Sequence, residues 1–391
     1  MVKSGLEMLL GRYPSELKGK RAGILCHAPS ITRDFSHITD LLSRHEDCRM
    51  TAIFGPQHGL FGQTQDNMIE WKGHIHPKYK IPIFSLYGED RKPTLEMLRE
   101  IDLLIIDLQD IGARLYTYIW TVKLCMEACM EAGIPVWLLD RPNPIAALAC
   151  DGPVLKEEFF TFVGGAEIPM CHGMTIGEMA LWIQDKYFKR CNLKVIKMEN
   201  WHRSMLFNET GLPWVIPSPN IPTLQTAIVY PGMVLVEALN ISEGRGTTIP
   251  FELFGAPFLD PYRLKKELDS RQISGCTFRI HNFIPTFNKF KDQVCNGLQI
   301  HIKDYREFRP VATAVEILEA VILTSPPGSL KFSEPPYEYE YNLIPFDILS
   351  GDSGIRTTLQ NRSSLKLEKE RWEDEIEVFR KEFRPISLYP E

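Results

Sequence analysis

Short runs of consecutive apolar residues recur through the first half of the chain, and polar or amphipathic stretches separate them. The runs cover residues 21–28, 50–56, 81–88, 101–108 and 134–140. Each run has the length of a strand rather than of a helix. Because continuous apolar strands that alternate with helices are typical of a parallel sheet covered on both faces, the pattern predicts a Rossmann-like, doubly wound α/β fold.

Several helices are predicted between these strands. Residues 118–132 are rich in aromatic, Met, Ala and Cys residues and predict a helix that ends at Gly133. Amphipathic stretches over 31–45 and 174–188 predict two more helices, and residues 192–198 predict a further strand. The passage 214–232 follows Pro213 and contains prolines at 217, 219 and 222, which predict a rigid extended segment instead of a helix.

The pattern changes near residue 225, where we place a domain boundary. The second part offers strands over 278–283 and 298–304 and helices over 311–323 and 363–383. This mixture predicts a smaller α+β domain over 226–391 after a Rossmann-like domain over 1–225. A length of 391 residues is consistent with two domains.

Polar clusters follow four of the predicted strands where each strand ends. Gln57 and His58 follow the second run, and Asp107, Asp110 and Arg114 follow the run at 101–106. Glu89 and the group Asp140, Arg141 and Asn143 follow two others. Because the carboxyl ends of parallel strands share one edge of the sheet, we expect a small-molecule site there, in a cleft between the two domains.

Composition narrows the range of partners and compartments. Lys plus Arg number 44 and Asp plus Glu 50, so the net charge is −6, and without a basic block a nucleic-acid partner is excluded. No apolar run approaches the roughly 18 residues of a membrane span. Nine scattered cysteines without a CxxC pair, and a start without a signal-peptide pattern, predict a cytoplasmic protein.

The common cofactor and catalytic signatures are missing. There is no GxGxxG after the first strand, no GxxxxGK[ST], no HExxH and no GxSxG, so neither a dinucleotide nor a metal cofactor is expected. His74 and His76 lack a third ligand at a matching spacing and are interpreted as loop histidines. Asp107 and Asp110 form either a metal-binding or acid/base pair, or a turn cap and an ion pair with Arg114, and the sequence leaves both open.

The segment 240–248, NISEGRGTT, is the most unusual passage. It combines Glu243 and Arg245 with small hydroxyl residues, including Thr247, and two glycines that allow a ligand to approach the backbone. A plain turn with an internal ion pair is the alternative interpretation. Because this segment lies just after the predicted domain boundary, we expect it to line the cleft between the two domains.

Taken together, these segments resemble a known family of glycosidases. The motifs that carry the resemblance are GPQHGLFG, SLYG followed by KPT, DLQDIGARLYTYIWT, LLDRPNP, DGPVL, CHGMTIGE, GLPWVIPSPNIPT, YPGMVLVEALNISEGRGTTIPFELFGAPF and IPFDILSG. Their order and content are similar to those of the exo-β-N-acetylmuramidase (NamZ-like) family, from about residue 5 to the C-terminus. The resemblance implies an active site between two domains and release of terminal N-acetylmuramic acid from peptidoglycan fragments.

One position departs from the family pattern. The family's P-E-H-G motif, whose glutamate is a catalytic candidate, is Pro56-Gln57-His58-Gly59 in this chain. Glutamine cannot act as a general acid, and a glycosidase normally uses two carboxyl groups. We therefore expect Glu243 or Asp110 to act as the acid/base, with Asp107 and Glu89 as further candidates. Gln57 and His58 are expected to lie beside these carboxyls in the catalytic site.

The remaining candidates are expected to bind the sugar. Arg114 and Arg245 suit its carboxylate, because a guanidinium offers two parallel donors. Aromatic side chains supply stacking faces, with Tyr116, Tyr118 and Trp214 as candidates. Polar side chains expected to contact the substrate are His58, Asp107, Asp140, Arg141, Asn143, His172, Ser218, Asn220 and Thr247, and Asp347 is a turn residue within reach of the cleft.

Two other functions are consistent with the sequence. Gln57 is compatible with a sugar- or muropeptide-binding protein that does not cleave. The same scaffold is also compatible with an enzyme for a phosphorylated or nucleotide-linked sugar. In each case we expect a monomer or a homodimer with a small saccharide as its partner.

Overall fold

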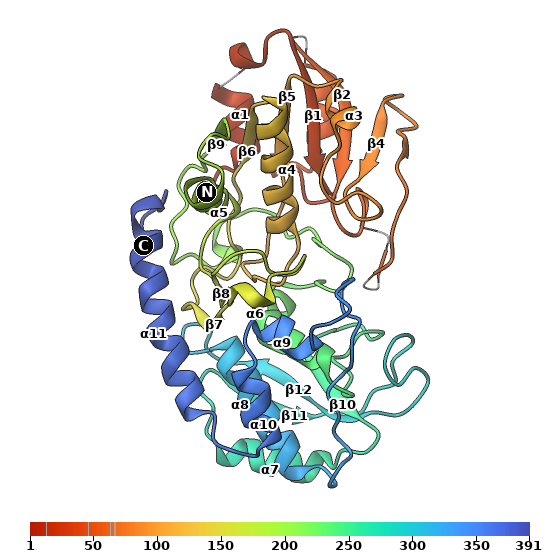
Figure 1. The fold of residues 1–391 in the computed structure, drawn as a ribbon, viewed down its shortest axis with the longest axis vertical. Coiled ribbons are helices and arrows are strands. Elements are labelled where there is room, and N and C mark those ends of the chain that lie inside the picture. Colours follow the sequence, from red (N-terminus) through yellow and green to blue (C-terminus); the bar gives the residue numbers. More distant parts are fainter. Residues whose placement is uncertain (13, 46, 63, 66–67) are drawn as a thin grey trace.

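A seven-stranded sheet dominates the first part of the chain (Figure 1). The computed structural model describes residues 1–391 except 13, 46, 63, 66 and 67. The strand order is β3-β4-β2-β1-β5-β6-β9, and all neighbours are parallel except β3, which is antiparallel to β4. The strands are β1 Lys20–Cys26, β2 Cys48–Gly55, β3 His74–Ile75, β4 Pro82–Ser85, β5 Leu103–Asp107, β6 Val136–Leu139 and β9 Leu193–Ile196. The sheet confirms the predicted Rossmann-like fold.

Helices cover both faces of this sheet, which explains why its strands are apolar throughout. They are α1 Gly5–Arg12, α2 Ile38–Ser43, α3 Leu95–Leu98, α4 Tyr118–Ala132 and α5 Ile176–Tyr187, with the 3₁₀ turn η1 Pro14–Leu17. In β5, Leu104 and Ile106 join the same core as α4, whereas Leu103 and Ile105 join the core that contains α1 and α2. Successive side chains of each strand therefore pack on opposite layers.

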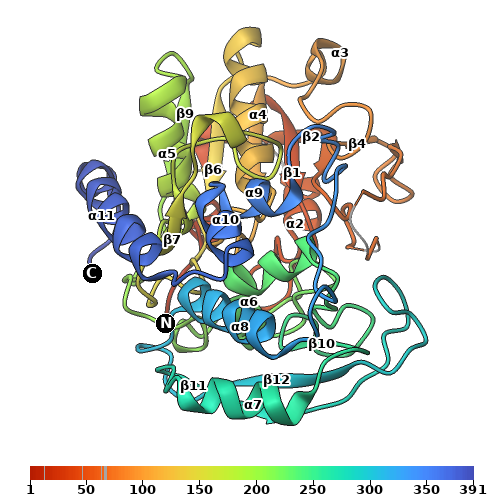
Figure 2. The same cartoon turned by 60° about the horizontal axis from the view of Figure 1, so that its bottom comes forward.

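The second part is built around a three-stranded antiparallel sheet in the order β10-β12-β11. Helix α6 packs against α8, and α7 packs against α8, β11 and β12 (Figure 2). The elements of this part are α6 Leu224–Met233, η4 Val234–Ala238, β10 Leu253–Ala256, α7 Pro261–Ser270, β11 Cys276–Ile280, β12 Asn296–Ile302, α8 Pro310–Thr324, α9 Pro345–Ser350, α10 Gly354–Gln360, α11 Lys366–Phe383 and η5 Arg384–Ile386.

Between the two sheets lies a short antiparallel pair, β7 and β8, against which the C-terminal helix α11 packs. The connecting elements are β7 Asp151–Val154, η2 Glu157–Phe159, β8 Pro169–Cys171 and η3 Phe207–Glu209. One core cluster runs continuously from strand residues such as Leu25 through α4 and α8 to Phe383. None of the described helices has both the length and the apolar character needed to cross a membrane.

Two predicted elements were wrong. The helix predicted over 31–45 is confined to Ile38–Ser43, because Phe35 adopts a left-handed φ of 63° and His37 caps the helix start by accepting from the Thr39 N–H. The extended segment predicted up to residue 232 gives way to helix α6 from Leu224. Thr223 caps that helix, so the four prolines lie before it, and only Pro231 lies inside it.

Candidate active site

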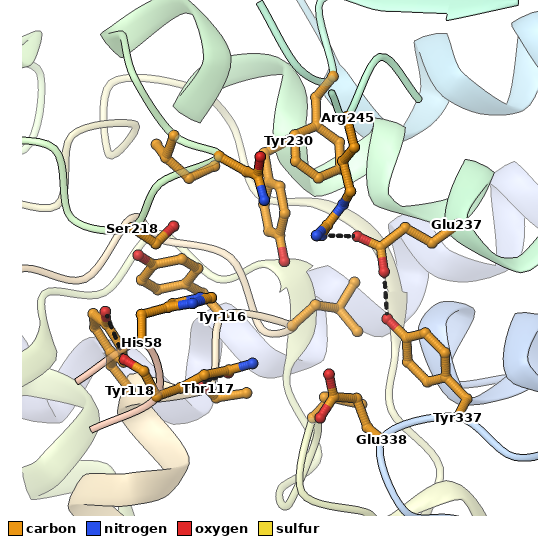
Figure 3. Close-up of a pocket in the computed structure, with 16 residues that line it drawn as sticks. His58, Tyr116, Thr117, Tyr118, Ser218, Tyr230, Glu237, Arg245, Tyr337 and Glu338 are labelled. Atoms are coloured by element: carbon orange, nitrogen blue, oxygen red, sulfur yellow. Dashed lines mark hydrogen bonds and ion pairs between the residues drawn. The ribbon is translucent and has the colours of Figure 1, made fainter. Parts of the chain in front are cut away.

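One pocket gathers side chains from both parts of the chain, with an empty volume of about 480 Å³ (Figure 3). The lining residues are Gln57, His58, Leu115, Tyr116, Thr117, Tyr118, Val163, Ser218, Asn220, Ile221, Tyr230, Glu237, Arg245, Phe251, Tyr337 and Glu338.

The sheet topology positions the first half of this lining. Gln57 and His58 follow the carboxyl end of β2, and residues 115–118 lie at the start of α4, in the connection that follows β5. His58 has a φ of 70° and Gly59 one of 80°, so the chain turns sharply as it leaves the strand. The pocket therefore lies at the edge of the sheet where parallel α/β proteins bind their ligands.

The second half of the lining comes from residues after 217. Helix α6 supplies Tyr230, the turn η4 supplies Glu237, and the loop after η4 supplies Arg245. A later loop, between α8 and α9, returns to the pocket with Tyr337 and Glu338.

Glu237 is the centre of a charged group in the pocket (Figure 3). Its Oε1 accepts a hydrogen bond of 2.5 Å from Arg245 Nη2, and its Oε2 accepts one of 2.7 Å from Tyr337 Oη. Burial also raises the pKa of Tyr337 well above its ordinary value, so this hydroxyl stays protonated and donates. The arrangement fixes a negatively charged carboxylate at the pocket wall.

Glu338 is the second carboxyl of the pocket and has the opposite character. Burial raises its pKa to about 7, and the charge of Glu237 contributes in the same direction. Its Oε2 accepts a hydrogen bond of 2.8 Å from Tyr87 Oη. A carboxyl with a pKa near 7 can give up a proton at neutral pH, which is the requirement for a general acid.

His58 presents a neutral imidazole. Its Nδ1 lies 2.7 Å from the Thr64 carbonyl oxygen, so Nδ1 carries the hydrogen and Nε2 is an acceptor. Burial is the main cause that lowers its pKa to about 4, and the nearby Arg245 charge contributes. His58 therefore accepts a hydrogen bond from a ligand and does not supply positive charge at neutral pH.

Gln57 lies in the same pocket and is buried. Its Oε1 accepts a hydrogen bond of 2.5 Å from Thr117 Oγ1. This contact leaves the two hydrogens of the amide nitrogen to donate elsewhere. The side chain thus offers a polar contact for a ligand but no titratable proton.

Aromatic rings form a continuous wall of the pocket. Tyr116 lies 4.7 Å from Tyr118 and 6.1 Å from Tyr230, measured between ring centroids, and Tyr230 lies 4.8 Å from Phe251. Such faces suit a sugar ring, which has apolar C–H surfaces as well as hydroxyls.

Seven of the residues expected from the sequence meet in this pocket. They are Gln57, His58, Tyr116, Tyr118, Ser218, Asn220 and Arg245. The side chain of Asn220 donates to the Gln65 carbonyl oxygen at 2.6 Å, which places that loop beside the pocket.

Glu243 does not line the pocket, although it lies directly behind it. Its carboxylate is buried and contacts Lys289 Nζ at 2.9 Å and Arg245 Nε at 3.3 Å. Burial works to raise its pKa, but the charges of Lys289 and Arg245 outweigh burial and lower the pKa. The structure thus gives Glu243 the role of orienting Arg245.

Asp110 and His172 form a buried pair outside the pocket lining. Asp110 Oδ2 accepts from the Gly112 N–H at 2.7 Å and lies 3.8 Å from His172 Nε2. Burial raises the pKa of Asp110 to about 7 and lowers that of His172 to about 3. The predicted pairing of Asp110 with Arg114 is wrong, because Arg114 donates to the main-chain carbonyls of Pro153, Ile168 and Leu349.

The other predicted polar residues are engaged in structural contacts elsewhere. Asp107 pairs with Arg141, with an Oδ1–Nε distance of 2.5 Å, and so does not cap the turn as one interpretation expected. Asp140 accepts hydrogen bonds from Tyr389 Oη and Thr175 Oγ1. These residues stabilise the sheet edge, and the structure gives no reason to assign them to a ligand.

Four further predicted residues also lie away from the pocket. Asn143 bridges the carbonyl of Met174 and the N–H of Ile145. Thr247 Oγ1 donates to the Gly244 carbonyl oxygen. Trp214 packs edge-on against Phe207, and Asp347 pairs with Arg356. Glu89 is not among the lining residues either.

The sequence analysis missed six of the polar and aromatic lining residues. They are Thr117, Tyr230, Glu237, Phe251, Tyr337 and Glu338. Glu237 lies six positions before Glu243, in the motif YPGMVLVEALNISEGRGTTIPFELFGAPF that carries the family resemblance. These two acidic residues in one motif were the signal that could have pointed to Glu237. No local pattern marks Glu338, because its place in the pocket depends on a loop that returns from the second part.

The fold and the pocket define a class of protein. The chain is an α/β protein whose sheet edge and C-terminal part enclose an aromatic, polar pocket with one ionised and one protonatable carboxyl. Among the described residues, no three His, Cys, Asp or Glu side chains are grouped as metal ligands would be.

The chain belongs to the exo-β-N-acetylmuramidase NamZ family. The model of the family's N-terminal region matches residues 22–225, and the model of its C-terminal region matches residues 228–389.

Individual relatives agree with this assignment. The chain is 39% identical over 389 residues to the peptidoglycan β-N-acetylmuramidase NamZ of Bacillus subtilis strain 168, covering 99% of this chain and 91% of the relative. A crystal structure of a DUF1343 family protein from Bacteroides fragilis NCTC 9343 matches with a TM-score of 0.87 at 31% identity, covering 99% of each chain. A second such protein from the same strain matches with a TM-score of 0.76 at 28% identity, covering 100% of this chain and 99% of the other.

Proposed function

We propose that the protein is an exo-acting glycosidase that removes terminal N-acetylmuramic acid from peptidoglycan fragments. Family membership supports the substrate class. The observation that carries the chemistry is the pair of unlike carboxyls, Glu237 and Glu338, in one pocket. Glycosidases use such a pair because one group must donate a proton while the other stays negative.

In this mechanism Glu338 is the acid. Its carboxyl donates a proton to the glycosidic oxygen as the bond from that oxygen to the anomeric carbon breaks. A water molecule forms the new bond to the anomeric carbon, and the proton that this water loses returns to the Glu338 carboxylate. Glu237 stabilises the positive charge that develops on the sugar ring, and Arg245 with Tyr337 keeps its carboxylate in place. Gln57 and His58 contact the sugar's polar groups and transfer no proton in this scheme.

Exo-acting cleavage is part of the proposal and is supported by family membership. Residues 57–58 and 337–338 all line the pocket that we propose for the terminal sugar. We place the active-site cleft between a first domain, 1–225, and a second domain, 226–391. Gln57 does not argue for a non-cleaving protein in this account, because two other carboxyls supply the chemistry.

The cellular compartment and the oligomeric state are also part of the proposal. All nine cysteines are unpaired in the structure, which supports a reducing compartment such as the cytoplasm. We propose a monomer or a homodimer that meets small muropeptides rather than the intact wall.

Glu338→Gln tests the acid assignment. Loss of a general acid lowers kcat by about 10²- to 10⁴-fold when the leaving group is a sugar alcohol. The loss is smaller for 4-nitrophenyl N-acetylmuramide, because nitrophenolate leaves without a proton. The measurement is kcat on this glycoside and on an N-acetylmuramyl disaccharide.

Glu340→Gln is the matched control, since Glu340 lies two residues away and outside the pocket lining. It keeps an oxygen for the Asn342 N–H that Glu340 binds. A Glu338→Gln variant that cleaves both substrates at the wild-type rate would overturn the assignment of Glu338 as the acid.

A further inference from the structure

The turn that carries Glu338, residues 337–340, has an unusual backbone. The Tyr337 N–H donates to the Glu340 carbonyl oxygen and the Glu340 N–H donates to the Tyr337 carbonyl oxygen, both at 2.9 Å. The two central residues, Glu338 and Tyr339, have φ angles of 46° and 67°. This left-handed region is rarely adopted by residues other than glycine, so contacts outside the turn must stabilise it.

Arg91 supplies one such set of contacts. Its guanidinium carbon lies 4.1 Å from the ring centroid of Tyr339, 4.5 Å from that of Phe162 and 5.8 Å from that of Tyr87. The cation thus packs among three aromatic rings from three separate segments of the chain. Tyr339 Oη also donates to the Met68 carbonyl oxygen at 3.3 Å.

Tyr87 supplies the second set, directly on the carboxyl. Its hydroxyl accepts a hydrogen bond from the Met68 N–H at 3.1 Å and donates one to Glu338 Oε2 at 2.8 Å. While the Tyr87 hydroxyl donates to Oε2, that oxygen is an acceptor, and Oε1 is the oxygen available to carry the proton of a neutral Glu338. The contact therefore favours Oε1 as the oxygen that carries the catalytic proton.

We propose that Arg91 and Tyr87 are positioning residues for the acid of this enzyme. Arg91 fixes the turn through Tyr339, and Tyr87 fixes the carboxyl so that Oε1 presents its proton to the glycosidic oxygen. The inference rests on the proposed function, because it takes Glu338 as the proton donor.

The charges around Glu338 predict that Arg91 and Tyr87 affect the pH dependence of the activity. Burial and Glu237 raise the pKa of Glu338, whereas Tyr87, Arg91 and Arg245 lower it. The other titratable groups on the turn are Tyr337, Tyr339 and Glu340. Burial raises the pKa of Tyr337 and, together with Glu70, that of Tyr339, whereas the Asn342 N–H lowers the pKa of Glu340. Since the acid works only while protonated, removal of Arg91 or of the Tyr87 hydroxyl raises the pH at which activity is lost.

The test compares Arg91→Met, Arg91→Lys and Tyr87→Phe with Arg99→Met, an exposed arginine outside the pocket and its contacts. On the disaccharide we expect kcat to fall about tenfold in Arg91→Met and Tyr87→Phe, with KM nearly unchanged. We also expect the alkaline limb of kcat to move to higher pH by about half a unit in both variants. Arg91→Lys keeps the charge, so the alkaline limb of its kcat stays near the wild-type position. Arg99→Met changes neither kcat nor the position of the alkaline limb.

A different pattern overturns the inference. If Arg91→Met and Tyr87→Phe lower the melting temperature or kcat but leave the alkaline limb where it is in the wild type, the two residues are merely structural. If Glu338→Gln is inactive on the disaccharide while these variants cleave it normally, the positioning role fails and the proposed function stands. If Glu338→Gln is fully active on the disaccharide, Glu338 is not the acid and the positioning role fails with it. If the wild type does not cleave the disaccharide, the proposed function itself fails.

Discussion

At the scale of single residues, this protein buries several carboxyls for which the described residues show no ion pair with a lysine or an arginine. Burial raises the pKa of Asp110 and Asp140 to about 7 and that of Asp151 to about 6. Each accepts hydrogen bonds from main-chain N–H groups, which only partly offset the loss of water. These carboxyls are therefore neutral or nearly so over much of the acidic range.

Asp110→Asn tests this interpretation through stability. A native pKa of about 7 against an ordinary 3.8 means that the native state binds more protons between about pH 4 and 7, so stability falls as pH rises through that window. The asparagine side chain does not titrate, so the variant does not lose stability in this way. Relative to the wild type, its free energy of unfolding should increase between pH 5 and pH 8, by about 2–3 kcal/mol.

Urea unfolding of both proteins at the two pH values measures the difference, and the other buried carboxyls cancel because both proteins contain them. The same difference at pH 5 and pH 8 would contradict the raised pKa of Asp110.

Only part of the candidate site could be predicted from the sequence at this scale. Gln57, His58 and Arg245 were predictable because they follow strand ends or sit among glycines. Arg114 and Asp140 share the same kind of position, yet their side chains turn inward to main-chain carbonyls and to Tyr389. Sequence position identifies the edge of the sheet, but not which way each side chain points.

At the scale of elements, helices were predictable where their ends carry local signals. Helix α4 ends at Ala132 as expected, because Gly133 follows in the left-handed conformation with a φ of 69°. Helix α6 was missed because four prolines precede it. The 337–340 turn has no glycine to mark its left-handed residues, so nothing in the local sequence predicts it.

The C-terminal tail after α11 is an element whose contribution can be measured. Tyr389 is buried, packs edge-on against Trp201, and donates from its hydroxyl to Asp140 Oδ2 at 2.5 Å. Tyr389→Phe keeps the ring but removes a donor from a buried carboxyl. We expect a loss of about 1–2 kcal/mol in the free energy of unfolding at pH 7.

Denaturant unfolding of Tyr389→Phe, beside Tyr262→Phe as an exposed control, checks this value. A Tyr389→Phe variant as stable as the control would show that the Tyr389 hydroxyl does not stabilise the end of β6.

At the scale of the whole molecule, the pocket exists only because the second part of the chain returns to the first. Glu237 and Arg245 come from the region after α6, and Glu338 comes from a loop about 100 residues further on. The parallel sheet and the α+β character of the second part could be predicted from periodicity. The closing of the pocket could not, because it depends on contacts such as Tyr87 with Glu338, 251 residues apart in sequence.

The central claim is that this pocket receives a terminal N-acetylmuramic acid and that the chain cleaves the bond beside it. The most direct measurement is mass spectrometry of the products from two defined peptidoglycan tetrasaccharides, one that begins with N-acetylmuramic acid at the non-reducing end and one that begins with N-acetylglucosamine. The account predicts release of free N-acetylmuramic acid from the first and no cleavage of the second. Cleavage of the second, or an intact first substrate, would contradict it.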